Sequence, residues 1–493
     1  MNHSHEDAAR ELELVFALAG PVGSDLQEVS RTLGDALKKG EYSAVEEISV
    51  STLIRQIAKR RRMPVVEKPE DRRIASLMDA GNAIRRVCAS PATLATAAMG
   101  EIRGVRNRNG GKPSRRAYVI RSLKRPEEVN LLRRVYGPGF FLLGVNVPRP
   151  ARVDSLAKHI ARSHGETPAS PNFPAHVQEA EALAQRDEDE ELDPYGQRLR
   201  DVFQLCDVFV SANAEASLFD QIYRFVRLIL GDLGETPWAD EQFMYQAFAA
   251  SLSSGALGRQ VGAVLVSSTK EVLGIGWNDT PKAGGGLYRA GEHYDRRDLH
   301  EERDSVNVHA DQILEEILDA AQSAGWLGTR PTLEEARVAF RRSRVTGLLE
   351  FGRTAHAEME AVLAASRIGA SPRGATLYTT TFPCHECARL IVTAGIARVV
   401  YIEPYPKSRA IELHRDAILA YDDVEAPHCD DTACSDTHTV LFEPFVGIGP
   451  HRYHDLFSTT TETASAARGN LKVPVTASPG TPERRFRKSK CSP

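Results

Sequence analysis

The stretch "TFPCHEC", residues 381–387, places two cysteines three positions apart directly after a proline. Taken alone, such a C-x-x-C pair is consistent with a redox couple, a structural zinc clip or one half of a catalytic metal site. A second stretch, "HAEME", begins 28 residues before Cys384 and separates His356 from Glu358 by one residue. The two stretches together decide between the three alternatives.

The residue types of the two stretches fit a catalytic metal site. Two thiolates and a neutral imidazole balance the charge of Zn²⁺ and leave a fourth coordination position for water, which a closed structural site does not. We therefore expect His356, Cys384 and Cys387 to bind Zn²⁺. Glu358 can face the same pocket without binding the metal, and we expect it to carry protons in catalysis. The alternative is a solvated Glu358 beside a core histidine.

The combination of H-x-E with P-C-x-x-C resembles the signature of zinc-dependent nucleobase deaminases. The segment from about 238 to 457 is similar to cytidine deaminases, and more narrowly to deoxycytidylate deaminases. It has "RQVGAVLV", "GIGWN", "HAEME" and "TTTFPCHECARLIVTAGIARVVY" in the order of that family. The resemblance implies an α/β/α domain that hydrolytically deaminates dCMP, dCTP or both to deoxyuridine nucleotides.

The resemblance also implies residues that bind the substrate. Asn278 would contact the sugar, and Ala357 would lie against the bound nucleotide. Tyr401 and the following "EPYPKS" would line the base and phosphate pocket, with Lys407 and Ser408 as phosphate contacts. For Lys407, an exposed loop lysine without a ligand is an equal alternative.

The first part of the chain alternates short apolar runs with amphipathic stretches. The runs at 12–20, 117–123, 140–145 and 206–210 lack alternation, which is typical of buried parallel strands. We expect a parallel-sheet domain over residues 10–233, a second α/β domain over 236–457, and a disordered tail over 458–493. The Pro- and Ser-rich stretch at 164–176 and the acidic "RDEDEELDPYG" after it predict a surface excursion.

The first strand leads into "ALAGPVGSDL", where a P-loop kinase would bind phosphate. Gly20 and Gly23 are only three apart and no lysine follows, so phosphoryl transfer is not expected. Gly20, Gly23, Ser24 and Asp25 could still bind a nucleotide through backbone amides. A tight turn with Ser24 or Asp25 as helix cap is an equal alternative.

The whole chain resembles bacterial anti-phage dC deaminases of the AvcD type, in which a P-loop kinase-like domain precedes the deaminase. That resemblance implies nucleotide depletion in defence against phage, a homo-oligomer, and a small inhibitory RNA as partner. Between Ile102 and Pro126 there are nine Lys or Arg and no acidic residue. A solvated surface is the commoner explanation for this basic stretch, and a triphosphate or RNA contact is the alternative.

The composition indicates a globular protein of a reducing compartment. Seven cysteines in 493 residues is an odd and ordinary count. No run approaches the roughly 18 apolar residues of a membrane span, and the start lacks a secretory signal. We therefore expect a cytoplasmic protein that does not contact membranes. Its formal net charge of −4 gives no general reason to expect nucleic acid as the main partner.

Several features keep more than one interpretation. A polynucleotide cytosine or adenine deaminase would carry the same signature, and so would an RNA-binding or nucleotide-sensing regulator with an inactive deaminase core. The insertion at 289–353 is a lid, an allosteric site or an interface. A helix is predicted near 409–420. The cluster "HCDDTACSDTH" is either a polar loop or a second zinc site, and its four potential ligands are His428, Cys429, Cys434 and His438.

Overall fold

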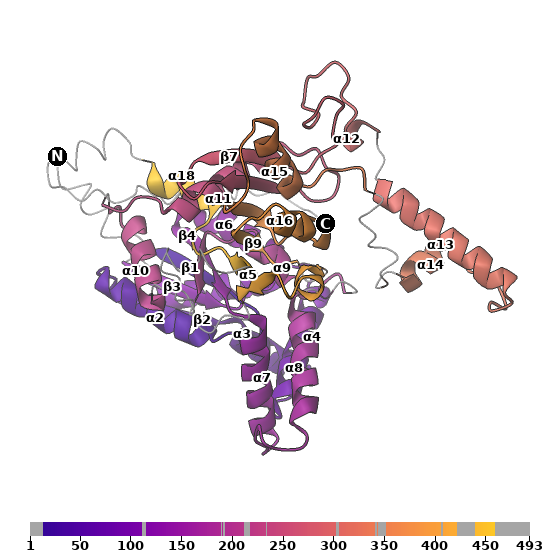
Figure 1. The fold of residues 1–493 in the computed structure, drawn as a ribbon. Coiled ribbons are helices and arrows are strands. Elements are labelled where there is room, and N and C mark those ends of the chain that lie inside the picture. Colours follow the sequence, from indigo (N-terminus) through magenta and orange to yellow (C-terminus); the bar gives the residue numbers. More distant parts are fainter. Residues whose placement is uncertain are drawn as a thin grey trace, which may run out of the picture.

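The computed structural model describes residues 13–110, 115–188, 190, 193–211, 217–232, 234–301, 305–340, 343, 352–405, 408–421 and 439–458. These residues form two six-stranded sheets, each flanked by helices (Figure 1). The predicted fold class, an N-terminal parallel-sheet domain followed by an α/β/α domain, is confirmed. None of the described helices is long and apolar enough to cross a membrane.

The first sheet has the strand order β12-β5-β4-β1-β3-β2. All neighbouring strands are parallel except β12, which pairs antiparallel with β5. The strands are β1 (Leu14–Ala19), β2 (Ala44–Ser49), β3 (Arg116–Arg121), β4 (Phe140–Asn146), β5 (Val208–Ser211) and β12 (Gly447–Ile448). Because β3 and β4 lie on opposite sides of β1, the strand order reverses there, and ligands of open α/β sheets bind at such a point.

Helices cover both faces of the first sheet. One face packs against α2 and α10, and the other packs against α3, α5, α6 and α9. Helices α7 and α8 extend from this domain beside α4 and share a small apolar core (Figure 1). The helices are α2 (Leu26–Lys39), α3 (Val50–Arg61), α4 (Glu70–Val87), α5 (Thr93–Arg108), α6 (Pro126–Tyr136), the 3₁₀ turn η1 (Gly137–Gly139), α7 (Arg149–Ser163), α8 (Phe173–Glu188), α9 (Leu199–Phe203) and α10 (Leu218–Ile229).

The second sheet has the strand order β10-β11-β9-β8-β6-β7, with β6 antiparallel to both of its neighbours. Its strands are β6 (Gly262–Val266), β7 (Val272–Trp277), β8 (Thr376–Thr381), β9 (Arg398–Glu403), β10 (Ile418–Ala420) and β11 (Val440–Pro444). The helices of this part are α11 (Ala239–Ser251), α12 (Asp298–Glu301), α13 (Ser305–Ser323), α14 (Leu333–Phe340), α15 (Ala357–Arg367), α16 (His385–Thr393), α17 (Ala410–Leu413) and α18 (Pro450–Phe457).

The two domains share one apolar core. Phe243 of α11 and Tyr378 of β8 belong to the same buried cluster as residues of β1 and β3. After β11 the chain returns to the first sheet, where Phe445 packs edge-on against Phe209 at 5.6 Å and β12 extends the sheet beyond β5. The predicted domain boundaries stay a prediction, because the last strand of the first sheet comes from the end of the second domain.

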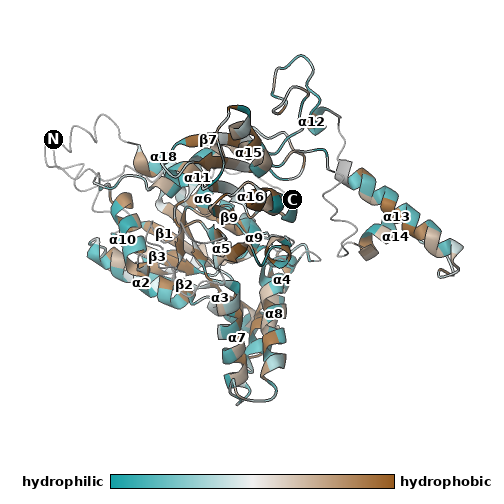
Figure 2. Cartoon of the chain, in the orientation of Figure 1, coloured by the Kyte–Doolittle hydropathy of each residue, from teal (hydrophilic) through white to brown (hydrophobic). Residues whose placement is uncertain are grey.

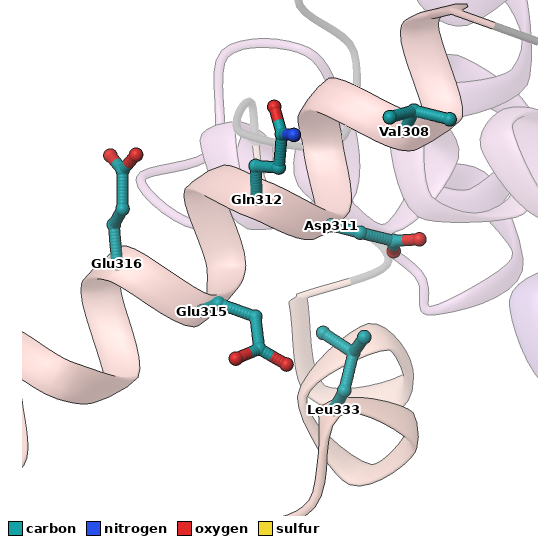
Figure 3. Close-up of a pocket in the computed structure, with 6 residues that line it drawn as sticks. All are labelled: Val308, Asp311, Gln312, Glu315, Glu316 and Leu333. Carbon is teal, nitrogen blue, oxygen red and sulfur yellow. The ribbon is translucent and has the colours of Figure 1, made fainter.

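Helices α13 and α14 lie in the insertion and project away from the two sheets (Figure 1). Arg337 of α14 donates to Asp311 of α13 at 2.7 Å, which holds the two helices together. The open groove between them is lined mainly by polar and acidic side chains, among them Glu315 and Gln312 (Figure 3). Figure 2 shows, by contrast, that hydrophobic residues concentrate on the strands of the body.

Two predicted local structures are wrong. The acidic stretch does not form an exposed excursion, because Phe173–Glu188 is helical and both Asp187 and Glu188 are buried. The helix predicted near 409–420 ends at Leu413, and Ile418–Ala420 forms a strand beside β11. The expected disorder of the tail concerns residues outside the described part, apart from Ser458.

Glu403, at the end of β9, links the two domains. Its carboxylate accepts from Gln204 of the first domain at 2.6 Å and from Arg259 of the second. Burial raises the pKa of Glu403 to about 7, and the Arg259 guanidinium opposes that rise. The folded protein therefore retains a proton that the unfolded chain releases above a pH of about 4.5. The stability that this proton provides is lost as the pH rises from about 4.5 to 7.

We expect Glu403→Gln to remove the loss of stability that Glu403 causes as the pH rises. The melting temperature of the variant, relative to the unmodified chain, should rise by about 2–3 °C between pH 5 and pH 8. Scanning fluorimetry across this range measures the effect, with the exposed Glu316→Gln as control. A constant difference between the two proteins at all pH values would show that Glu403 ionises normally in the folded state.

Candidate active site

The N-termini of α15 and α16 bring the predicted metal ligands together. His356 is the N-cap of α15 and Cys384 is the N-cap of α16, and both have extended backbones. Cys387 lies in the first turn of α16, so the three-residue spacing places both sulfurs at the same helix end. Helix N-termini favour negative charge, which stabilises thiolates.

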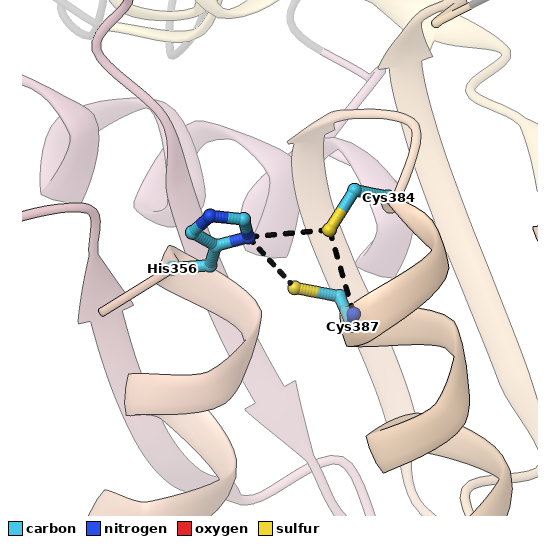
Figure 4. A group of neighbouring side chains, drawn as sticks. All are labelled: His356, Cys384 and Cys387. Carbon is cyan, nitrogen blue, oxygen red and sulfur yellow. Dashed lines mark hydrogen bonds between the residues drawn. The ribbon is translucent and has the colours of Figure 1, made fainter. Parts of the chain in front are cut away.

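The three side chains point toward one another (Figure 4). His356 Nδ1 lies 3.3 Å from Cys384 Sγ and 3.3 Å from Cys387 Sγ. All three potential ligand atoms lie within 4.8 Å of one another, a separation that one metal ion can bridge. Cys387 is fully buried and Cys384 nearly so. This donor set fits Zn²⁺, which binds thiolate and imidazole together.

Glu358 lies in the first turn of α15, two residues after His356, and its side chain is 4% exposed. Its Oε2 lies 3.5 Å from Cys387 Sγ. The carboxylate is therefore next to the sulfur pair, as the spacing of H-x-E predicts. The alternative of a solvated first-turn acid does not hold in this structure.

The electrostatics of this group reflect burial and mutual contact. The hydrogen bond from Cys387 and the contact with His356 lower the pKa of the Cys384 thiol to about 4. The hydrogen bond with Cys384 raises the pKa of His356 to about 9. Burial raises the pKa of Glu358 to about 6, although His356 opposes the rise. Cys384 is therefore the thiol that ionises first.

Two glycines of β7 set the position of helix α15. A Cβ atom on Gly276 would lie 2.2 Å from the Ala357 carbonyl oxygen, and one on Gly274 would lie 2.1 Å from that of Ala361. These are backbone atoms that side-chain rotation cannot move. The G-x-G of "GIGWN" thus lets α15 lie directly on the strand, and this contact places His356 and Glu358.

We expect Gly276→Ala to destabilise the protein by about 1–3 kcal/mol and to lower its zinc affinity. The added methyl must displace the first turn of α15, which carries His356. Chemical denaturation and zinc titration measure the two effects. Gly258→Ala is the control, because nothing lies within 4 Å of a Cβ at that position. Zinc affinity and stability equal to the control would show that the strand tolerates a side chain there.

Part of the chain matches a known protein family. Residues 238–403 match the family model described as "Cytidine and deoxycytidylate deaminase zinc-binding region". The C-terminal part therefore contains a region similar to cytidine and deoxycytidylate deaminases. Zn²⁺ is the metal of this family region, and His356, Cys384 and Cys387 form a group among its described residues that could hold the ion.

The similar curated proteins include deoxycytidylate deaminases of phage and animals. The enzyme of Enterobacteria phage T2 is 48% identical over 54 residues, 11% of this chain and 29% of the phage protein. The Homo sapiens enzyme is 25% identical over 162 residues, 33% of this chain and 63% of that protein. The chain thus spans less than two thirds of either relative. The dCMP deaminase from cyanophage S-TIM5 is 19% identical, with a TM-score of 0.23, over 43% of this chain and all of that one.

The predicted substrate residues of the deaminase domain have structural contacts of their own. Asn278 accepts from Val261 N and donates to Arg259 O, both at 2.7 Å, and so holds the loop before β6. Ser408 Oγ donates to Pro383 O at 2.7 Å, which ties the loop after β9 to the Cys384 turn. Ala357 is buried at the start of α15. Their contacts with substrate stay predictions.

Tyr401 lies at the end of β9 and packs edge-on against Phe382 at 4.9 Å. Its side chain also lines a cleft toward the first domain. Lys407 lies outside the described residues, and so does the cluster of His428, Cys429, Cys434 and His438.

The loop after β1 has the geometry of a capped tight turn. Asp25 caps α2 by accepting from the amides of Gln27 and Glu28. Gly23 has a φ of +90°, and a Cβ there would lie 2.5 Å from the Arg152 carbonyl oxygen. The Ser24 hydroxyl is buried and has no hydrogen-bond partner. Nucleotide binding by Gly20, Gly23, Ser24 and Asp25 stays a prediction.

An acidic side chain of the protein occupies this loop. Asp187 of α8 accepts from Val22 N at 2.8 Å and from Lys124 Nζ at 2.7 Å. Lys124 also donates to the Gly20 carbonyl oxygen at 2.8 Å. The Asp187 carboxylate thus accepts the hydrogen bond of a loop amide that could otherwise have bound a phosphate. The acidic stretch is recognisable in the sequence. The two residues that Asp187 contacts lie 165 and 63 residues away along the chain, so sequence patterns did not predict these contacts.

The basic stretch between Ile102 and Pro126 is largely neutralised within the chain. Seven of its eight cations in the described part of the chain form ion pairs, for example Arg116 with Glu46 and Arg121 with Glu47 across β3 and β2. This pairing favours the interpretation as a charged structural surface. The RNA contact stays a prediction.

Proposed function

We propose that the protein hydrolyses the exocyclic amine of deoxycytidine nucleotides, dCMP, dCTP or both, and releases deoxyuridine nucleotides and ammonia. The observation that carries this proposal is the group of half-buried His356 with buried Cys384 and Cys387, with Glu358 beside it. The similarity of residues 238–403 to deoxycytidylate deaminases supports the substrate class.

In this proposal, His356, Cys384 and Cys387 hold Zn²⁺, which when bound makes water a strong nucleophile at neutral pH. Glu358 takes one proton from the water that adds to C4 of cytosine and gives it to ring N3. It then moves the second water proton to the amine, so that the C4–N4 bond breaks and ammonia leaves. The uracil C4 carbonyl remains.

The burial of Glu358 supports this role. A carboxylate that must move two protons in succession has to stay beside the reacting atoms, and Glu358 is fixed in the first turn of a helix packed on β7. Its low exposure also keeps bulk water away from the transferred protons. Ser408 also ties the loop after β9 to Pro383, the residue before Cys384.

Ammonia release by the zinc-loaded full chain tests the proposal. The substrates are dCMP, dCTP, deoxycytidine and a cytosine-containing single strand, assayed in parallel with Glu358→Ala as control. Turnover of a nucleotide that the control lacks would support the proposal and identify the phosphate level. Turnover of the strand alone would make the protein a polynucleotide deaminase, and absence of turnover on all four would contradict the enzymatic role.

The resemblance to anti-phage deaminases supports a wider proposal, in which the reaction depletes the nucleotides that a replicating phage needs. Cells that express the chain should lose deoxycytidine nucleotides after infection, and cells that express Glu358→Ala should not. Mass spectrometry of nucleotide extracts measures this difference. A homo-oligomer and an inhibitory RNA belong to the same proposal, and sizing with and without RNase treatment tests both.

A further inference from the structure

We propose that the cleft between the two sheets binds a phosphate group through Arg149 and Arg152, and that the bound anion acts on the deaminase domain through Tyr401. This cleft is separate from the His356, Cys384 and Cys387 group, and it adjoins the loop of Gly20–Asp25 at Pro21. The binding part of the proposal does not depend on the deaminase reaction.

The cleft lies where strands of both sheets end. On one side it is lined by Pro21 after β1 and by residues 145–147 at the end of β4. On the other side it is lined by Tyr401 and Ile402 of β9, by Pro404 after that strand and by Pro444 of β11. The carboxyl ends of the two sheets thus face the same space. In open α/β sheets, ligands bind at such ends, beside the strand where the order reverses.

Arg152 supplies an unsatisfied cation to this cleft. Its side chain is 8% exposed, and only Nη2 has a described partner, Glu188 of α8. Both Nε and Nη1 are buried without a hydrogen-bond partner. Buried donors of a charged group are costly to leave unpaired. An anion in the cleft would satisfy them.

Arginines outnumber carboxylates among the described residues that line the cleft. Arg149 contacts both oxygens of Glu188 at 3.2 Å, so that one carboxylate serves two guanidinium groups. Arg200 also lines the cleft, and its Nε lies 3.9 Å from Glu403 and from Asp201. Arg149 and Arg152 stand in the first turn of α7, where the helix dipole adds positive potential. Of the residues that the structure describes, three guanidinium groups and the Glu188 carboxylate line the space.

The size and donors of the cleft indicate a phosphate group. Guanidinium groups bind phosphate oxygens in pairs and more specifically than ammonium groups do. The volume is about 130 Å³. Pockets that enclose a whole small molecule are about 300–1,000 Å³, so this cleft has room for a phosphate group and not for an enclosed nucleotide. The phosphates of a nucleotide and inorganic phosphate share this chemistry.

Tyr401 connects the cleft to the metal ligands. Its ring lines the cleft on one side and packs against Phe382 on the other. Phe382 N donates to the Glu403 carbonyl oxygen at 2.8 Å, and Phe382 is followed by Pro383 and Cys384. A ligand that fixes Tyr401 therefore acts on the turn that holds Cys384.

Isothermal titration calorimetry in phosphate-free buffer tests the site on the full chain. The probes are dTTP, inorganic phosphate and deoxythymidine, and none of them has a cytosine amine to lose. We expect dTTP or phosphate to bind and deoxythymidine to give no heat. Equal affinities for dTTP and phosphate would assign the site to the inorganic ion, and tighter binding of dTTP would assign it to a nucleotide.

Variants of α7 decide whether the cleft holds the anion. Arg152→Gln and Arg149→Gln should each weaken binding by about tenfold or more. Arg162→Gln, at an exposed position of the same helix, should leave it unchanged. The Arg149 side chain is 38% exposed, so its variant tests the site even if Arg152→Gln disturbs folding. No binding of any phosphate probe, or equal affinity in Arg149→Gln and Arg162→Gln, would overturn the proposal.

Discussion

Glu358→Gln is expected to lower kcat for a deoxycytidine nucleotide by about 10²–10⁴-fold while zinc content stays unchanged. Glutamine has nearly the same shape as glutamate but cannot accept a proton from water or pass it on. Because Glu358 stands beside the sulfur pair and not in the His356, Cys384 and Cys387 group, its replacement leaves the metal ligands intact. The effect should therefore fall on kcat and leave zinc binding alone.

Steady-state kinetics and metal analysis of the same preparation separate these two quantities. Glu386→Gln is a matched control, because Glu386 lies between the two cysteines in the first turn of α16 and pairs outward with Arg389. This control should keep kcat within about twofold of the unmodified chain. A Glu358→Gln protein with full zinc and undiminished kcat would mean that another group moves the protons.

The catalytic group could be predicted from the sequence because its geometry is local. In each stretch the spacing spans less than one helical turn, so the positions of His356 and Glu358, and of Cys384 and Cys387, follow from where α15 and α16 begin. Only the relative position of the two helices depends on contacts between distant segments. The G-x-G of β7 is the sequence feature that reflects this position, because those glycines allow α15 to pack directly on the strand.

The cleft between the sheets could not be predicted in the same way. Its buried ion pair joins Arg152 to Glu188, which belongs to an acidic run that reads as solvent-exposed. Strand β2 was missed for a related reason: Glu46 and Glu47 look unsuited to a strand until Arg116 and Arg121 of β3 neutralise them. Charges that are paired across distant segments mislead rules based on local hydropathy.

Cys387→Ser is expected to weaken zinc binding by more than about 100-fold and to abolish deamination. A serine hydroxyl stays protonated at neutral pH and is a poor ligand for Zn²⁺ compared with a thiolate. Cys387 is fully buried and belongs to the apolar core of the deaminase domain, so the new hydroxyl also loses its hydration. Competition with a chelator of known affinity measures the zinc constant.

Cys206→Ser is the control that separates the loss of a zinc ligand from the cost of burying a hydroxyl group. Cys206 is a buried free cysteine of the first domain, and its thiol contacts the Val202 carbonyl oxygen at 3.6 Å. Both variants place a hydroxyl in an apolar core, but only Cys387→Ser removes a proposed ligand. We therefore expect a similar loss of stability in the two metal-free proteins and a loss of zinc in Cys387→Ser alone. Retention of one zinc per chain by Cys387→Ser would mean that the metal binds elsewhere, and the cluster from His428 to His438 would be the next candidate site.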